Sequence, residues 1–306
     1  MIDMSYLVAD KDFYAPSDAA DPGTRYHAEP MPAGWTKRDS GVWVHWMPAG
    51  SILAESGWKV HVSSSLTNAQ SVLSVVSAVC AESGIQFKHL AGKHTFLLMH
   101  SKHATRVQSG KFCAIYPQTQ EAALAVMRRL ETELAGISGP YVLTDRRFGD
   151  SMCVSYRYGA FRGRTRIDGD GYQVHTMLGP DGQEIDDERK PTFHLPQGVT
   201  DPFRPETVAA KGTGPVVLRG YRFEKVLQHS NAGGAYRFTS DQGEPVFIKE
   251  AKSHNGYTDD GADAKGRLNA ECLTLRAIHG RAPGLCPKPI ELFEYQRSYP
   301  RSRRGR

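Results

Sequence analysis

The chain has 306 residues, of which 40% are apolar and 23% charged, as expected for a folded protein with one large domain or two ordinary ones. No apolar run approaches the roughly eighteen residues that a membrane-spanning helix needs, and the N-terminus lacks the basic and apolar regions of a signal peptide. The five cysteines are scattered and never in CxxC spacing. We therefore expect a cytoplasmic protein without a membrane partner, a disulfide framework or a metal site.

Positive charge is concentrated in one stretch of the chain. Residues 59–166 hold 14 Lys and Arg against 6 Asp and Glu, a net charge of +8, whereas the other 24 basic and 27 acidic residues give −3. Such a concentration indicates an anionic partner, either a nucleic acid or a phosphorylated molecule. A basic surface that is simply solvated is the alternative interpretation.

The first part of the chain predicts a mixed α+β domain. Alternating apolar and basic residues predict a strand at 57–62. Amphipathic spacing predicts helices at 66–80, capped by Ser65 or Thr67, and at 119–134. Further strands are expected at 85–88, 95–99, 111–116, 141–143 and 152–158. Residues 163–220 are rich in Gly, Asp and Pro, which predicts turns and short strands leading into a linker near 210–215.

A second unit is expected to begin near residue 221. Strands are predicted near Val226, Tyr236 and Val246, followed by a helix at 267–279. We therefore divide the chain into a domain of residues 1–210 and a second domain of residues 218–306.

Basic residues recur on the predicted strands of the first domain. Lys59 and His61 are two residues apart on one strand, so both side chains face the same way. The others on or beside predicted strands are Lys88, Lys111, Arg147 and Arg157. No run of acidic residues is expected to neutralise them, so the group suits a phosphate, which carries about −1.5 to −2 charges. Crowded cations also favour a neutral lysine, which can act as a base. Taken singly, such residues are more often structural or extend to solvent.

Six short blocks of residues resemble, in the same order, the lyase domain of class III/IV lanthipeptide synthetases. These blocks are 57–63 (GWKVHVS), 87–90 (FKHL), 110–117 (with GKF and IYP), 139–141 (GPY), 145–150 (DRRFGD) and 156–161 (YRYGAF). That domain is in turn similar to the phosphothreonine lyases of bacterial pathogens. The resemblance implies a phosphothreonine-lyase-like fold and β-elimination of phosphate from phosphoserine or phosphothreonine in a precursor peptide, without a cofactor.

The same resemblance implies roles for individual residues. Lys88 would be the base that removes the Cα proton, and His61 the acid that protonates the leaving phosphate oxygen. The phosphate would be held by Lys59, Lys111, Arg147 and Arg157, with Tyr158 as a supporting hydrogen-bond donor.

The second unit resembles part of a protein-kinase N-lobe, made of antiparallel strands and one helix. Residues 227–236 (LQHSNAGGAY) look like a phosphate loop and 246–249 (VFIK) like the strand that carries the kinase lysine. The implied nucleotide-binding residues are Gly233, Gly234, Lys249 and its partner Glu271, with ATP and magnesium as ligands. Taken alone, the loop is a weak signal, and a plain hairpin turn is then the better interpretation.

The chain departs from the kinase pattern in its remaining residues. It contains neither a His-Arg-Asp-type catalytic loop nor an Asp-Phe-Gly motif, and residues 297–306 do not resemble the next kinase strand. We interpret them as a truncated end, with a native basic tail as the alternative. We expect no kinase activity, although the N-lobe invites classification as a Ser/Thr protein kinase. A separate polypeptide would then supply the kinase or the cyclase.

A non-catalytic module that binds phosphopeptides or nucleic acid is the competing hypothesis. Nucleic-acid modules interleave aromatic platforms with basic residues. Here Trp43, Trp46 and Trp58 come ahead of the basic stretch, so we do not expect a nucleic-acid partner.

Overall fold

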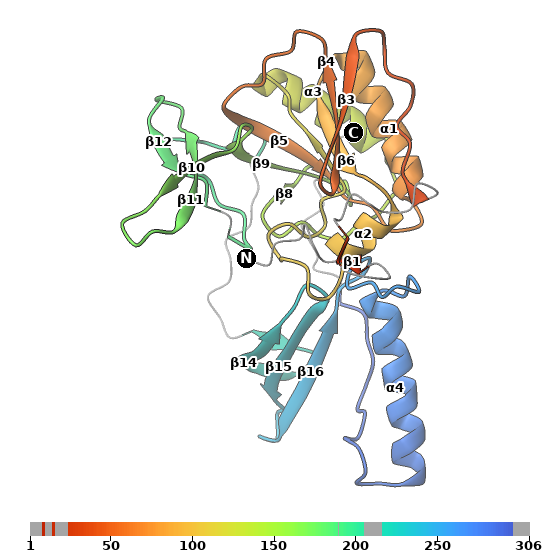
Figure 1. Ribbon diagram of the computed structural model, residues 1–306. Coiled ribbons are helices and arrows are strands. Elements are labelled where there is room, and N and C mark those ends of the chain that lie inside the picture. The colour runs from red at the N-terminus through yellow and green to blue at the C-terminus, as the bar shows by residue number, and fades with distance from the viewer. Residues whose placement is uncertain (1–7, 10–13, 16–23, 189, 205–215, 296–306) are drawn as a thin grey trace, which may run out of the picture. The chain divides into compact units, whose positions relative to one another are not determined.

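The computed structural model describes residues 8–9, 14–15, 24–188, 190–204 and 216–295 (Figure 1). Contacts divide the chain into unit 1, residues 1–99 and 105–205, and unit 2, residues 100–104 and 206–306. The predicted linker near 210–215 lies outside the described residues. Among the residues that are described, no helix is long and apolar enough to cross a membrane.

A seven-stranded antiparallel sheet forms the centre of unit 1, with the strand order β3-β4-β6-β7-β5-β9-β8. Its strands are β3 (Trp35–Ser40), β4 (Trp43–Pro48), β5 (Ser56–Val62), β6 (Phe87–Leu90), β7 (Cys113–Ile115), β8 (Arg146–Arg147) and β9 (Val154–Ala160). The predicted strands at 57–62 and 152–158 are confirmed as β5 and β9, which pair along their whole length. A short pair, β1 (Val8–Ala9) and β2 (Tyr14–Ala15), is separate from this sheet.

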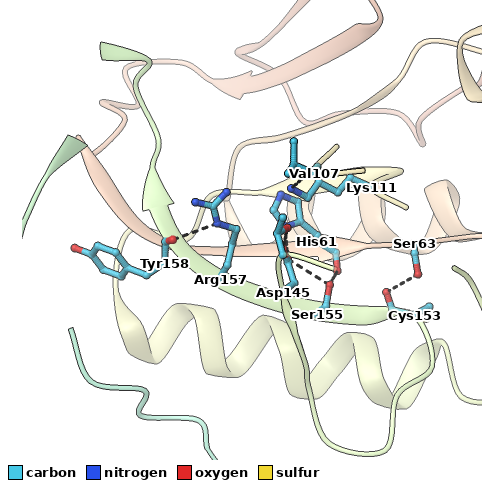
Figure 2. A network of polar contacts seen from close by, with 10 residues as sticks. His61, Ser63, Val107, Lys111, Asp145, Cys153, Ser155, Arg157 and Tyr158 are labelled. Carbon is cyan, nitrogen blue, oxygen red and sulfur yellow. Dashed lines mark hydrogen bonds and ion pairs between the residues drawn. The ribbon is translucent and has the colours of Figure 1, made fainter. Parts of the chain in front are cut away.

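Two helices pack on one face of this sheet. α1 (Ala69–Ser83) contacts β6 and β7, and α3 (Gln120–Glu133) contacts β5 and β9. Val60 and Val62 of β5 are fully buried, as are the helix residues that face the sheet. Because Lys59 and His61 alternate with these valines, they lie on the face away from the helices. Figure 2 shows the His61 side chain on this face of the strands.

Helix α3 confirms the predicted helix at 119–134. Thr119 caps it by accepting a hydrogen bond from the backbone N–H of Ala122 at 3.1 Å. The apolar stripe that predicted it, Ala123, Met127, Leu130 and Leu134, is buried.

Helix α1 begins three residues later than predicted. Asn68 occupies its N-cap position, so the expected capping role of Ser65 or Thr67 is wrong. The Ser65 hydroxyl accepts a hydrogen bond from the Asn68 N–H at 3.2 Å. It therefore stabilises the turn that precedes the helix instead of the helix itself.

The strand predicted at 95–99 is wrong, because these residues belong to helix α2 (Lys93–Met99). Thr95 bonds both the N–H and the C=O of Gly92 through its hydroxyl, at 2.9 and 2.8 Å. Phe96 and Met99, one helical turn apart, are both buried. A short apolar run does not distinguish a buried strand from a buried helix by periodicity alone. Residues 141–143 likewise form no strand.

Short strands follow the main sheet, as the turn-rich composition of 163–220 predicted. β10 (Arg164–Ile167), β11 (Gln173–Leu178) and β12 (Glu184–Asp186) form a three-stranded antiparallel sheet. This small sheet brings the residues after β12 to the end of β9.

Unit 2 contains the predicted strands and helix. β13 (Val217–Leu218), β14 (Tyr221–His229), β15 (Gly233–Thr239) and β16 (Pro245–Ala251) form an antiparallel sheet in sequence order. Helix α4 (Ala264–Arg281) contacts β16. Asp263 caps this helix by accepting a hydrogen bond from the Gly266 N–H at 2.8 Å.

Candidate active site

One row of side chains crosses the sheet of unit 1 on the face away from the helices. Directly opposed residues of an antiparallel pair point to the same face. The registers place in this row His45 of β4, Lys88 of β6, Ala114 of β7, His61 of β5, Ser155 of β9 and Arg147 of β8. Both predicted catalytic residues and one predicted phosphate ligand, Arg147, thus belong to this row, although they come from distant parts of the sequence.

Lys88 and His61 lie on the two strands that flank β7. Neighbouring strands are about 4.8 Å apart, so the two Cα atoms are about 10 Å apart. Between them Ala114 contributes only a methyl group. A base and an acid at this spacing can act on two different atoms of one bound residue.

The predicted absence of an acidic partner for His61 is wrong. Nδ1 of His61 lies 2.5 Å from Oδ2 of the buried Asp145 carboxylate (Figure 2). Thr144 donates a hydrogen bond to Oδ1 at 2.6 Å, and Ser155 donates one to Oδ2 at 3.4 Å. Asp145 is therefore held on both oxygens, and it fixes the ring of His61.

Electrostatics favour an ionised Asp145 and a neutral His61. Burial alone would raise the pKa of the Asp145 carboxyl, but His61, Lys111 and the Thr144 hydroxyl hold that pKa well below its usual range. Burial lowers the pKa of His61 to about 4, against the opposing effect of Asp145, and nearby Lys111 and Lys59 lower it further. At neutral pH, the Nδ1–H of His61 thus donates a hydrogen bond to the Asp145 carboxylate, and Nε2 keeps its lone pair.

Lys88 lies against an aromatic ring and a neutral histidine. Its Nζ is 4.3 Å from the ring centroid of Trp43, a cation–π distance. His45 is its direct neighbour on β4, and burial, aided by the charges of Lys88 and Arg38, lowers the pKa of His45 to about 4. The sequence analysis named Trp43 only as a possible aromatic platform and did not name His45, because the pairing of β4 with β6 joins segments more than forty residues apart.

The predicted phosphate ligands occupy different places around this row. Lys59 is two residues from His61 and lies 5.8 Å from the ring of Tyr116. Lys111 precedes β7 instead of lying on it, and its Nζ donates to the backbone carbonyl of Val107 at 2.9 Å. Its influence on the pKa of His61 places its charge beside the row.

Arg147, at the β8 end of the row, lies with its guanidinium 5.5 Å from the ring of Tyr141. Tyr158 is on the opposite face of β9, where its ring packs against Trp58 and its hydroxyl contacts Ser56 at 3.2 Å. The structure therefore does not bring Tyr158 to the row.

Arg157 is opposite Lys59 and also has an acidic partner. Its guanidinium donates to Asp187 at 2.7 Å, and both side chains are buried. Asp187 was not predicted, because it follows β12 and nothing local in the sequence connects it with β9. Within the described ranges, no group of three or more His, Cys, Asp or Glu side chains could hold a metal ion.

The candidate nucleotide-binding residues lie together in unit 2. Nζ of Lys249 lies 2.7 and 2.5 Å from the two carboxylate oxygens of Glu271. Gly233 and Gly234 begin β15, and a Cβ at Gly233 would lie 2.0 Å from the carbonyl oxygen of Glu250. Only glycine fits there, because β15 and β16 approach closely where the loop ends and β15 begins.

The loop before Gly233 is fixed by a pair of buried amides. Asn231 and Asn255 exchange side-chain hydrogen bonds of 3.1 and 3.0 Å. The backbone C=O of Asn255 also accepts a bond from Ala264 at the start of α4. The loop is thereby tied to the helix that carries Glu271.

Comparison with known proteins identifies the first unit. The family model described as "RamC, N-terminal domain" matches residues 23–215. The chain belongs to this family. The resemblance seen in the six blocks is confirmed at that level.

A curated relative of this RamC-family chain is "Probable SapB synthase" of Streptomyces coelicolor, which is 38% identical over 287 residues. The match covers 90% of this chain and 31% of the relative, so the chain spans about a third of that protein. Solved structures that match include the phosphothreonine lyase effectors of Chromobacterium violaceum and Shigella flexneri. They are 20% and 21% identical, each covers 42% of this chain, with 66% and 71% of their own chains matched, and the TM-scores are 0.34 and 0.33.

Proposed function

We propose that unit 1 eliminates phosphate from phosphoserine or phosphothreonine residues of a precursor peptide, as one part of lanthipeptide synthesis in the cytoplasm. The observation that carries this proposal is the row in which Lys88 and His61 flank Ala114, with Asp145 behind His61. Membership of the RamC N-terminal-domain family supports it.

Lys88 acts as the base. Once deprotonated, its amine takes the Cα proton, the Cα–H electrons form the Cα=Cβ double bond, and the Cβ–O bond breaks toward the phosphate. The products are dehydroalanine or dehydrobutyrine and hydrogen phosphate. Positioned acid–base groups contribute roughly a hundred- to ten-thousand-fold in rate.

His61 acts as the acid once the phosphate is bound. Without a bound phosphate, burial keeps the ring neutral despite the Asp145 carboxylate beside Nδ1. A phosphate beside Nε2 favours the imidazolium form, because an opposite charge stabilises the protonated ring. That ring then gives its Nε2 proton to the leaving oxygen, while Asp145 keeps it oriented. Lys59, Lys111, Arg147 and Arg157 neutralise the charge that moves onto the phosphate.

Mass spectrometry of a phosphoserine peptide tests the proposal. The wild-type protein should remove the elements of phosphoric acid, which leaves an alkene that a thiol can trap. Lys88→Ala should abolish this product but leave peptide binding nearly intact, since the base acts on Cα and not on the phosphate. A peptide that is bound by the wild type but never converted would favour the alternative of a non-catalytic phosphopeptide-binding module.

A second candidate function is nucleotide binding by unit 2, favoured by the Lys249–Glu271 pair. In kinases this lysine contacts the α- and β-phosphates. Titration with a fluorescent ATP analogue and magnesium should show binding that Lys249→Ala weakens at least ten-fold. Lys225→Ala, which removes an exposed lysine of the same sheet, should bind as the wild type does. Equal affinity of all three proteins would contradict a nucleotide site at Lys249.

A further inference from the structure

The side chain of Arg157 folds along β9, away from His61. Its guanidinium lies over Gly159, where a Cβ would come within 2.8 Å of Nη2 and 3.2 Å of Cζ. Ser155, which pairs with His61, lies two residues before Arg157 on β9, whereas Gly159 lies two residues after it. Gly159 and Ser155 are thus about 13 Å apart. In this position the guanidinium points away from His61 along the strand.

Three features of the chain hold Arg157 there, the first being the hydrogen bond from its Nε to the backbone carbonyl of Tyr158 at 3.3 Å. Glycine at position 159 leaves the space that the guanidinium fills. Oδ1 of Asp187 accepts a hydrogen bond from Nη2 of Arg157 at 2.7 Å. The side chains of Arg157 and Asp187 are only 8% and 1% exposed. Charge-assisted bonds between buried groups are among the stronger ones in proteins. The pair lines a cavity of about 370 Å³ together with residues of β11 and β12.

A phosphate and the Asp187 carboxylate are both anions, and the oxygens of each can accept hydrogen bonds from the Arg157 guanidinium. We propose that Asp187 competes with the substrate's phosphate for Arg157 and thereby sets the affinity of the site for phosphate. This rests on the proposed role of Arg157 as a phosphate ligand. Binding moves Arg157 from Asp187 to the phosphate, and Asp187 takes the arginine back when hydrogen phosphate leaves. Asp187 is therefore a positioning residue, which does not touch the reacting atoms.

Calorimetric binding of a peptide with Cα-methylated phosphoserine tests this competition, because that residue has no Cα proton to lose. Asp187→Asn keeps the shape but removes the competing charge, so we expect binding about ten-fold tighter than in the wild type. Inorganic phosphate should also raise the melting temperature of this variant more than that of the wild type. Asp186→Asn is the matched control, since Asp186 lines the same cavity but pairs with Arg166 at the surface.

Loss of one member of a buried ion pair can destabilise a fold. If Asp187→Asn does not fold, Gly159→Ala replaces it, because the new methyl group displaces the guanidinium from Asp187 without removing a charge. It should likewise bind more tightly. In either variant, a second substitution of Arg157→Ala should abolish the gain.

Affinity equal to or weaker than that of the wild type in the folded variant would overturn the competition. The result is separable from the test of elimination, because the peptide cannot react. A wild type that binds the phosphorylated peptide no better than the unphosphorylated one would overturn the proposed function, and this inference with it.

Discussion

Two buried histidines, His61 and His89, and the half-buried His45 link the stability of unit 1 to pH. Burial is the main cause that lowers the pKa of His45, His61 and His89 to about 4. Their unfolded value is about 6.5, so between pH 6.5 and 4 the unfolded chain binds more protons than the folded one. The free energy of unfolding is therefore fully retained above this window and falls as the pH drops through it.

His89 should account for a measurable share of that loss. Its Nε2 accepts a bond from Trp46 at 3.2 Å and its Nδ1 donates to the Leu90 carbonyl at 2.8 Å, which fixes the neutral form. We expect His89→Asn to reduce the loss of unfolding free energy between pH 7 and pH 5 by about 2 kcal/mol. The measurement is urea unfolding followed by tryptophan fluorescence, since all four tryptophans are in unit 1.

The control for this measurement is His27→Asn, which alters an exposed side chain. Its stability should depend on pH as in the wild type. An unchanged slope in His89→Asn would mean that His89 is not the group protonated on unfolding.

Arg147 should contribute to affinity for phosphate through its charge. Removal of a phosphate partner raises KM and makes binding less sensitive to salt, because one screened attraction is lost. We expect Arg147→Ala to raise KM for a phosphopeptide about ten-fold. Arg128→Ala removes the same charge from the exposed face of α3 and should leave KM unchanged. If both variants behave alike, only the net charge matters and Arg147 is not at the phosphate.

The residues of the row were predictable only in part. Strand alternation put Lys59 with His61, and the block pattern added Lys88. Asp145 also lies in a quoted block, but its contact with His61 depends on the pairing of β8, β9 and β5. Pairings between distant segments leave no local periodicity, so the acidic partners of His61 and Arg157 could not be predicted.

Among the elements, those with long periodic stretches were predicted best. The stripe on α3 repeats over four turns and was read correctly, whereas α2 has only seven residues and was taken for a strand. Its turn depends on the Thr95 hydroxyl and on burial of Phe96, which sequence spacing alone does not reveal. Side-chain caps likewise become certain only when the backbone geometry is known.

The N-cap of α3 gives a prediction for this element. Thr119→Ala removes the hydrogen bond to the Ala122 N–H and should lower the free energy of unfolding by about 1 kcal/mol. Thr132→Ala is the control, because that hydroxyl bonds only the Arg128 carbonyl within the same helix. It should change stability by less than about 0.5 kcal/mol. Equal losses in urea unfolding would contradict the capping role.

For the whole molecule, we expect the two units to differ in activity. The 306 residues contain no His-Arg-Asp-type loop or Asp-Phe-Gly motif to hold magnesium and orient an attacking hydroxyl. We therefore expect the pure protein to transfer no phosphate from labelled ATP to an unphosphorylated peptide. It should still act on a peptide phosphorylated beforehand. Labelled peptide in the first assay would contradict this division.

Elimination removes the Cα hydrogen of phosphoserine, whereas hydrolysis of the phosphate ester leaves it in place. A peptide with deuterium at Cα of its phosphoserine, followed by mass spectrometry, distinguishes the two. We predict a dehydroalanine product without the deuterium, formed more slowly than from the unlabelled peptide, and no product with Lys88→Ala. A product that keeps the deuterium and carries a serine hydroxyl would show hydrolysis and contradict the assignment of Lys88 as the base.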